Sequence, residues 1–167
     1  TLTLGGTGSG TVAGNLSGTG AAGNAGLRVV KNGSGTWTLS GANSYTGSTT
    51  VNGGKLVLDY SANTPISSSS ILSLGGGEAV FKGNSSGATT AQISSLILGN
   101  TSRSAAALTL DANGGSGVGL TIGTLDTVSS RNSLIDYSSS SGNSITVNAI
   151  GSGMTIAHRI TLPGDGL

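Results

Sequence analysis

The sequence predicts an all-β protein that folds as a parallel β-helix, or β-solenoid, without long helices. Short apolar runs such as Leu108-Thr109-Leu110 alternate with Thr and Ser in the two-residue period of half-buried strands. Gly and Asn separate these runs, and no stretch of ten or more residues shows a helical period. Sandwiches and barrels also contain closely spaced strands, but similar Leu-x-Leu runs between Gly and Asn turns favour stacked, near-identical coils.

The composition fits such a fold and excludes several classes of function. Ser, Thr, Gly and Asn make up 92 of the 167 residues, and charged residues are 8%. Disordered chains combine few β-branched residues with high net charge, whereas Leu, Ile, Val and Thr recur here and the net charge is +1. That charge argues against nucleic acid as a partner. Without an apolar run of about 18 residues we expect no membrane insertion, and without Cys there are no disulfides, Cys-ligated zinc or thiol nucleophiles.

The first third of the chain contains the most regular strand pattern. Thr1–Leu4 alternates and predicts a strand that ends at Gly5-Gly6, whereas residues 7–26 predict one or two weak strands with loops. Leu27–Val30 predicts a further strand. The Asn52-Gly53-Gly54 turn supplies the positive φ that a tight turn requires. The three strands expected between residues 32 and 58 are 36–40, 49–51 and 56–58.

The remainder repeats the alternation of strands and turns. Residues 61–70 contain Pro65, which lacks a backbone donor, so this piece is expected outside the hydrogen-bonded ladder or at an edge. Ile93, Leu96 and Ile97 have helical spacing, but Gly99-Asn100 ends that run so early that a strand is the better interpretation. The strands expected in this part are 71–74, 78–81, 96–98, 108–110, 120–122, 134–135, 145–147, 154–156 and 160–162.

A longer motif lies between Gly35 and Leu56. It is Gly-x-Trp-x-Leu-Ser-Gly-x-Asn-x-Tyr-Thr-Gly-x-Thr-x-Val-x-x-Gly-x-Leu, within residues 32–58. This pattern resembles the passenger-associated transport repeat, also called the autotransporter-associated β-strand repeat. In that family the repeats belong to right-handed parallel β-helices of secreted bacterial surface proteins, and there are no common catalytic residues. The resemblance therefore implies a scaffold, and we expect one solenoid segment over residues 1–167 with 27–58 as its recognisable repeat.

The carboxylates are candidate catalytic residues, because some β-helical proteins act on polysaccharides. A glycosidase needs two carboxyl groups about 5–10 Å apart, with one held protonated. Asp111 with Asp126, or Asp126 with Asp136, are pairs that stacked coils could bring together. Each of them lies beside a strand end, where Asp usually caps a turn, so we expect no catalytic residue. The acidic residues are Asp59, Glu78, Asp111, Asp126, Asp136 and Asp165.

Three further patterns resemble functional sites, but none of them predicts a cofactor or a metal. His158 is the sole histidine, and no Gly-x-Ser-x-Gly elbow accompanies it with an oriented acid, so a solvent-facing side chain is expected. Gly18–Gly23 fits the dinucleotide fingerprint but lacks the following helix and the acid. Gly114–Val118 approaches a calcium-binding nonapeptide, but Gly119 stands where the Asp ligand belongs.

Sugar-related signals are equally weak. Trp37 follows the inward period with Leu39, so we expect a core residue and not part of a carbohydrate-binding groove. Chance explains the N-glycosylation sequons in a chain this rich in Asn and Ser. They begin at Asn15, Asn32, Asn84 and Asn100.

The first and last expected strands carry no obvious polar cap, although open terminal coils expose unpaired backbone groups. We therefore expect a slice of a longer rod, or subunits that stack end to end by β-augmentation. The start at Thr1 also indicates a processed product or a piece of a larger protein. The favoured function is a non-enzymatic stalk or adhesin segment of a secreted bacterial surface protein. The alternatives are a subunit of a self-assembling extracellular fibre and a β-helical polysaccharide-active enzyme. The partner that these features suggest is a further copy of the chain, end to end or laterally, and the sequence identifies no carbohydrate or protein receptor.

Overall fold

A computed structural model describes residues 1–18, 26–99, 106–127 and 142–151. Within these ranges all regular secondary structure is β-strand, and there is no helix. Accordingly, no helical segment in the described part of the chain could cross a bilayer. The prediction of an all-β protein without long helices is confirmed.

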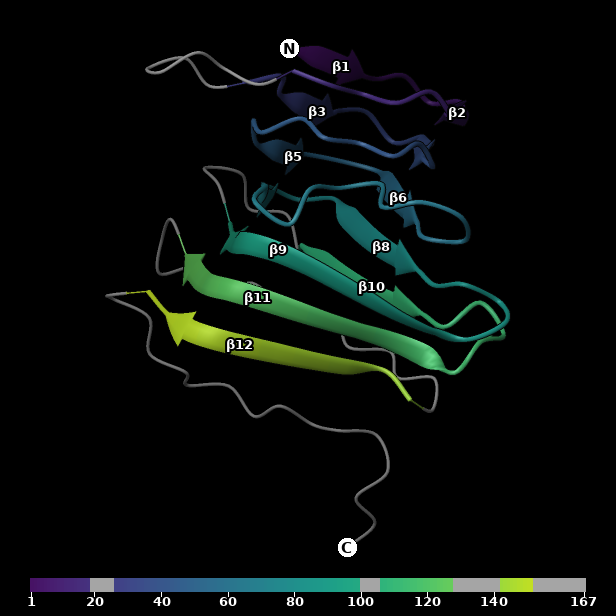
Figure 1. Ribbon diagram of the computed structural model, residues 1–167. Coiled ribbons are helices and arrows are strands. Elements are labelled where there is room, and N and C mark those ends of the chain that lie inside the picture. The colour runs from purple at the N-terminus through teal and green to yellow at the C-terminus, as the bar shows by residue number, and fades with distance from the viewer. Residues whose placement is uncertain (19–25, 100–105, 128–141, 152–167) are drawn as a thin grey trace, which may run out of the picture.

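The strands form two parallel sheets that the chain visits in turn (Figure 1). The larger sheet, sheet A, has the spatial order β1 (Leu2–Leu4), β3 (Val29–Lys31), β5 (Thr49–Val51), β7 (Ile71–Leu74), β9 (Ala88–Leu98), β11 (Gly117–Thr127) and β12 (Ser144–Ile150). The smaller sheet, sheet B, has the order β2 (Gly10–Val12), β4 (Thr36–Leu39), β6 (Lys55–Asp59), β8 (Glu78–Lys82) and β10 (Ala107–Asp111).

Except at the edges of the two sheets, each described strand therefore pairs with the strand one coil earlier and the strand one coil later. This pairing makes the molecule a β-solenoid of about five turns. Figure 1 shows the coils stacked from β1 to β12. The coils differ in length: Val29 pairs with Thr49 after 20 residues, whereas Leu96 pairs with Leu125 after 29 residues. The right-handed sense that the resemblance implies stays a prediction, in line with the strong preference of parallel crossovers for that hand.

The core lies between the two sheets and consists of side-chain columns along the stack. One column of sheet B contains Leu39, Leu58, Phe81 and Leu110, all buried and in register. Parallel in-register pairing places like positions above one another, so each coil covers the apolar side chains of the next. Each large aliphatic side chain removed from water in this way contributes about 1.5–3 kcal/mol of transfer free energy.

Trp37 occupies the neighbouring inward column, in register with Gly10 and Leu56. Its side chain is half-buried and packs against the core, and its indole Nε1 donates to the Gly5 carbonyl at 3.1 Å. A Cβ on Gly10 would lie 2.6 Å from the indole ring, so the missing side chain on β2 makes room for the ring on β4. The inward orientation expected for Trp37 is confirmed, but its burial is partial.

Most strand positions agree with the sequence, and the differences concern length. The expected strands 49–51 and 71–74 coincide with β5 and β7, and the piece with Pro65 is a connection without strand. The expected 96–98 and 120–122, in contrast, are parts of the 11-residue strands β9 and β11. The expected strands 134–135, 154–156 and 160–162 lie outside the described residues.

An interruption of the alternation explains why the full length of β9 was not foreseen. Ile93 and Leu96 are both buried, with two half-buried residues, Ser94 and Ser95, between them. The hydroxyl of Ser94 donates to the carbonyls of Ser69 and Ser70 at 3.0 and 2.9 Å. This interruption gives the apolar residues of β9 a helix-like spacing although the strand is extended. The same interruption recurs in β11, which pairs with β9.

Candidate functional site

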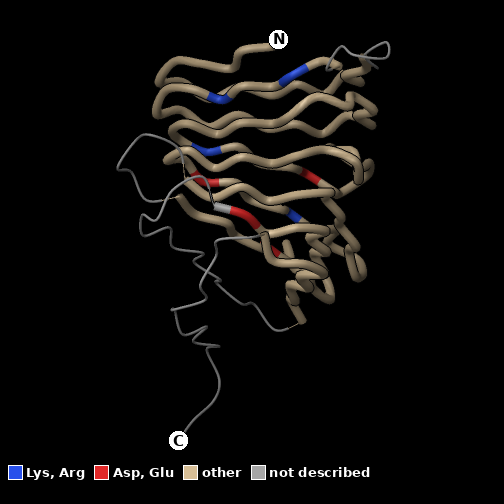
Figure 2. Tube along the Cα trace, turned by 90° about the vertical axis from the view of Figure 1, so that its left-hand side faces the viewer, with Lys and Arg blue, Asp and Glu red and all other residues tan. Residues whose placement is uncertain are grey.

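The outward face of sheet B gathers most of the charged side chains in the described part of the chain. On β6, residues 55, 57 and 59 alternate with buried Leu56 and Leu58, and β8 and β10 follow the same phase. Figure 2 shows how few charged positions the coils carry otherwise. The charged residues on this face are Lys55, Asp59, Glu78, Lys82 and Asp111.

Two ion pairs connect β6 and β8 at opposite ends. Lys55 Nζ lies 2.9 Å from Glu78 Oε2, and Lys82 Nζ lies 3.0 Å from Asp59 Oδ2. The order of charge is reversed between the strands, so only the observed register brings both pairs together. Thr109 on β10 extends the first pair by donating to Glu78 Oε1 at 2.9 Å.

The contacts of Asp59 with Ser61 and Lys82 together set its protonation state. Burial alone would raise the pKa of this carboxyl group. Hydrogen bonds from the hydroxyl and N–H of Ser61 and from Lys82, together with the charge of Lys82, lower the pKa below its usual value. A general acid needs the opposite shift, because it must hold its proton near neutral pH. Asp59 is therefore an anion at neutral pH, and its ion pair with Lys82 connects two coils.

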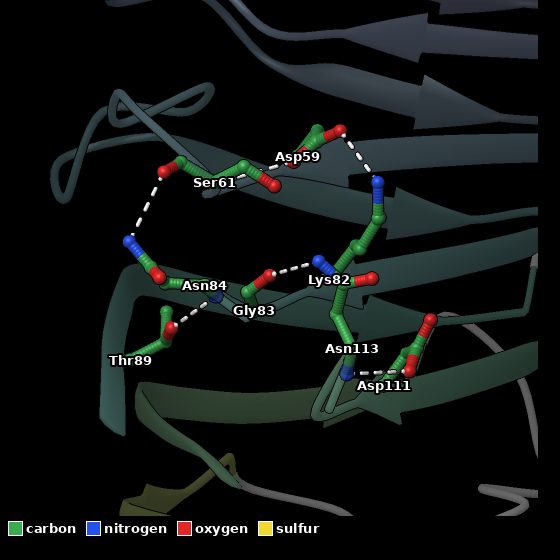
Figure 3. Close-up of polar contacts among 8 residues, drawn as sticks. All are labelled: Asp59, Ser61, Lys82, Gly83, Asn84, Thr89, Asp111 and Asn113. Carbon is green, nitrogen blue, oxygen red and sulfur yellow. Dashed lines mark hydrogen bonds and ion pairs between the residues drawn. The ribbon is translucent and has the colours of Figure 1, made fainter. Parts of the chain in front are cut away.

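A second polar feature is the corner where the chain passes from sheet B to sheet A. Asn63 Nδ2 donates to the Ser40 carbonyl, Asn84 Nδ2 to Ser61 and Asn113 Nδ2 to Gly83, each at 3.0 Å. Each amide thus reaches the carbonyl of the preceding coil, as Figure 3 shows for Asn84 and Asn113. We call this feature the asparagine corner, and it consists of Asn15, Asn43, Asn63, Asn84, Asn113 and Asn143.

Asn43 is the most deeply placed member of the asparagine corner, with 5% of its surface exposed. Its Oδ1 accepts from the Leu16 N–H of the coil before, and its Nδ2 donates to the Pro65 carbonyl of the coil after, both at 2.8 Å. The Asn43 N–H also donates to the Thr64 carbonyl at 3.1 Å. One side chain therefore connects three successive coils.

Of the carboxylate pairs expected from the sequence, Asp111 with Asp126 does not stack, because the two residues lie in different sheets. Asp111 ends β10 in sheet B, where its register partner is Lys82, whereas Asp126 lies on β11 in sheet A opposite Ile97. Asp111 Oδ1 accepts the Asn113 N–H at 2.8 Å, the turn-capping contact expected of it. Asp136 and Asp165 lie outside the described residues.

The remaining candidates are divided between residues that the structure describes and residues that it does not. His158, Asn100 and most of Gly18–Gly23 lie outside the described residues. Gly114, with φ of 83°, lies in the turn before β11. In the described part of the chain no three His, Cys, Asp or Glu side chains gather as a metal site. Asn15 and Asn84 belong to the asparagine corner, and Asn32 accepts a hydrogen bond from Asn52 at 2.9 Å.

The sequence interpretation missed two groups of residues. The asparagine corner repeats once per coil, but the spacing varies and Asn is common throughout, so only the strand positions would have revealed it. Lys31 was overlooked as well, although it shares the inward phase of Val29 on β3 and is fully buried. The signal that could have revealed Lys31 was a lysine at an inward position of a strand. Such a lysine needs partners in the core, because Lys is almost never fully buried unless paired.

In a comparison with known proteins, one segment of the chain matches a family model. Residues 29–58, which run from the start of β3 into β6, match the family model of the Passenger-associated-transport-repeat. No curated protein and no solved structure matches the chain. The matched segment contains Asn43, the Asn52–Gly54 turn and one strand pair of each sheet. The match confirms the suspected repeat and implies a segment of an autotransporter passenger with a β-helical fold.

Proposed function

We propose that this chain is a non-enzymatic structural segment of a secreted bacterial surface protein, a stalk that spaces other parts of the protein from the cell. The observation that carries the proposal is the uninterrupted parallel pairing of sheet A from β1 to β12. Such a stack resists bending, because each coil is bonded to its neighbours through backbone, core and corner side chains. Length along the stack is the quantity a stalk must supply.

The use of the polar side chains supports a structural role. Asp59, Lys82, Lys55 and Glu78 neutralise one another across coils. The amides of the asparagine corner bond to backbone groups of neighbouring coils. Polar groups that already have partners within the fold are poorly placed to bind a substrate, because a ligand would have to replace those bonds.

The composition supports secretion as an unfolded chain that folds outside the cell. There is no Cys, so the fold does not depend on oxidation. Aliphatic columns and backbone pairing need no cofactor to form. Each coil requires mainly its neighbour, so folding can proceed coil by coil from a nucleus.

A display experiment tests the stalk. The chain is placed between an N-terminal fluorophore site and an outer-membrane transport barrel, and energy transfer to a membrane dye is measured on cells. We expect a shorter and narrower distance distribution than for a Gly/Ser linker of the same number of residues. Seven strands about 4.8 Å apart span about 30 Å, whereas a flexible coil of this length has an r.m.s. end-to-end distance of about 65–80 Å. A distribution as broad and as long as that of the linker would contradict the proposal.

The enzyme alternative has its own test. The purified chain is incubated with a panel of surface polysaccharides, beside Asp111→Asn and Asp126→Asn variants. We expect no depolymerisation by any of the three. Depolymerisation by the parent chain that either variant abolishes would overturn the non-enzymatic proposal.

A fibre subunit is the second candidate, and β12 is the observation that favours it. Val147 and Ile150 continue inward columns of sheet A in register with Ile122 and Leu125, yet they are 37% and 47% exposed. An open strand with exposed apolar side chains is a template for another strand. Light scattering over a concentration series and electron microscopy separate the candidates: filaments that lengthen with concentration support the fibre, and discrete short rods support the stalk.

A further inference from the structure

Lys31 is a charged residue in an aliphatic column of the core. It ends β3, and its register neighbours are Leu4 on one side and Val51 on the other, followed by Leu74. None of its surface is exposed. The ion pairs of the described residues, Lys55 with Glu78 and Lys82 with Asp59, do not include it.

Backbone carbonyls take the place of a carboxylate partner. Lys31 Nζ donates to the carbonyls of Asn32 at 2.8 Å, Gly33 at 2.9 Å and Gly53 at 3.0 Å. A primary ammonium has three N–H donors, so these three acceptors use all of them. The first two carbonyls belong to the turn between β3 and β4, and the third belongs to the turn between β5 and β6, one coil later.

The two turns are shaped around this ammonium. Gly33 and Gly54 have φ of 73° and 62°, which L side chains rarely adopt. A Cβ on Gly54 would lie 2.8 Å from Lys31 Nζ and 2.5 Å from the Gly33 carbonyl oxygen. A side chain at this position would fill the space between the carbonyls, so the glycine keeps the space open for the ammonium.

We propose that the carbonyls of Asn32, Gly33 and Gly53 form a binding site for a primary ammonium group, which Lys31 occupies from within the same chain. The inference goes beyond the stalk function and does not depend on it. Emptied of the lysine, the site takes a small primary alkylammonium ion and discriminates against a quaternary one, which has no N–H to donate. The bound ammonium holds two successive turns at one spacing and thereby fixes the stacking of the first coils.

The electrostatics are consistent with such a site. Burial lowers the pKa of Lys31, since the charged form loses its hydration. Three carbonyl dipoles directed at Nζ oppose that loss, because only the protonated amine can donate three hydrogen bonds. The carbonyls thus supply the solvation that water provides for an exposed lysine.

Chemical rescue of Lys31→Ala tests the site. The truncated side chain leaves a cavity that n-propylammonium fills, since Ala retains the Cβ. The variant is refolded in n-propylammonium chloride, tetramethylammonium chloride or sodium chloride at one ionic strength, and thermal midpoints are compared. We expect a saturable rise of the midpoint with n-propylammonium only. Equal midpoints in the three salts would overturn the proposal.

Lys55→Ala is the matched control, because it removes a lysine whose side chain is 43% exposed and lies on the outward face of sheet B. We expect its thermal midpoint to respond alike to the three salts. A selective effect of n-propylammonium on Lys55→Ala as large as on Lys31→Ala would show a general salt effect and contradict the site.

Two further measurements keep the proposal testable if Lys31→Ala does not fold. In the unaltered protein, nitrogen-15 NMR should show slowly exchanging ammonium protons for Lys31, with none for Lys55 or Lys82. Lys31→Met keeps the apolar stem but donates no hydrogen bond, so we expect a lower urea midpoint. An Nζ signal that exchanges as fast as that of Lys55, or a Met variant as stable as the parent, would overturn the proposal.

Discussion

At the scale of single residues, the protein uses amides where many folds use charges. Six asparagines reach from one coil to the backbone of the next, although the strand ladders already connect the same coils. At the corner the ladders stop, and backbone N–H and C=O groups need other partners. An asparagine amide offers a donor and an acceptor together, so it can satisfy both kinds of group without net charge.

Asn43→Ala tests the most buried of these contacts. The change removes the acceptor for the Leu16 N–H and the donor for the Pro65 carbonyl. Each buried group left without a partner costs about 1–3 kcal/mol, so we expect a loss of about 2–4 kcal/mol in the free energy of unfolding, measured by urea titration.

Asn63→Ala is the matched control, since its exposed side chain makes one hydrogen bond, to the Ser40 carbonyl. Water can replace that bond, and we expect a loss of about 1 kcal/mol or less. Equal losses in the two variants would contradict the role assigned to Asn43.

Asp59 makes the stability of the protein depend on pH in acid. The pKa of this carboxyl group is lower in the folded state than the unfolded value of about 3.9. Its stabilising contribution is therefore fully present above the unfolded pKa and is lost as the pH falls through the folded pKa. Relative to Asp59→Asn, we expect the parent to be more stable at pH 7 by up to about 1 kcal/mol, and to lose this advantage below about pH 4.

Urea midpoints of both proteins between pH 7 and pH 2 measure this difference. Repeating the comparison in a Lys82→Met background removes the ammonium that holds the pKa of Asp59 down, so the pH-dependent part of the difference should shrink. A difference that grows on acidification would show that the sign of the shift is wrong.

At the scale of elements, register matters more than strand length. Strands of three residues such as β3 and β5 have only a few ladder bonds, and the turns that flank them fix their alignment. Gly35 lies in such a turn: its N–H donates to the Gly6 carbonyl at 3.1 Å, and its carbonyl accepts from Lys55 at 3.2 Å. The backbone of this residue is thus in contact with the coil before and the coil after.

Gly35→Ala should force the first coils apart. An added Cβ would collide with the Gly8 carbonyl oxygen in the preceding coil, and backbone on both sides limits relaxation. Overpacking of this kind costs about 1–3 kcal/mol, measurable as a lower urea midpoint. Gly87→Ala is the control, because its Cβ would meet nothing within 4 Å. A Gly35 variant as stable as the Gly87 variant would show that the coils have room to separate.

The elements also show what could be predicted from the sequence. Alternation of apolar and hydroxyl residues sufficed for β4 to β8, because each inward residue lies two positions from the next. It failed in β9, where Ser94 and Ser95 stand between inward residues and the partner of Ser94 is a distant backbone carbonyl. The prediction of a parallel solenoid was still correct, because that prediction depended on the absence of helices and on the repeated turns and not on the length of β9.

Contacts between coils were harder to predict than the strands themselves. The ion pairs of β6 and β8 require the register of residues 23 apart. Because the coil length varies from 19 to 29 residues, that register cannot be read from one sequence. The buried position of Lys31 depends on the same information, because its three acceptors come from two coils. Local sequence patterns therefore predicted the fold class, whereas the contacts between coils could be found only from the three-dimensional structure.

At the scale of the whole molecule, pairing predicts a gradient of local stability. Among the strands that the structure describes, β3, β5, β7, β9 and β11 have a neighbour on both sides in sheet A, whereas β1 and β12 have one each. In a stack with nearest-neighbour contacts, a coil held from both sides opens only with its neighbours, and an edge coil can open alone. The exposed Val147 and Ile150 weaken β12 further, since little apolar surface leaves the water there.

Amide hydrogen exchange measures this gradient directly. In dilute solutions of the isolated chain we expect protection factors to be highest in β5, β7 and β9, and at least about tenfold lower in β12, because a difference of 1.4 kcal/mol in opening free energy is tenfold in the open population. Exchange should be compared at two concentrations of the chain, so that pairing of β12 with a second copy would appear as slower exchange at the higher concentration. Protection of β12 equal to that of β7 at every concentration would contradict the gradient and show that a further strand covers this edge within one molecule.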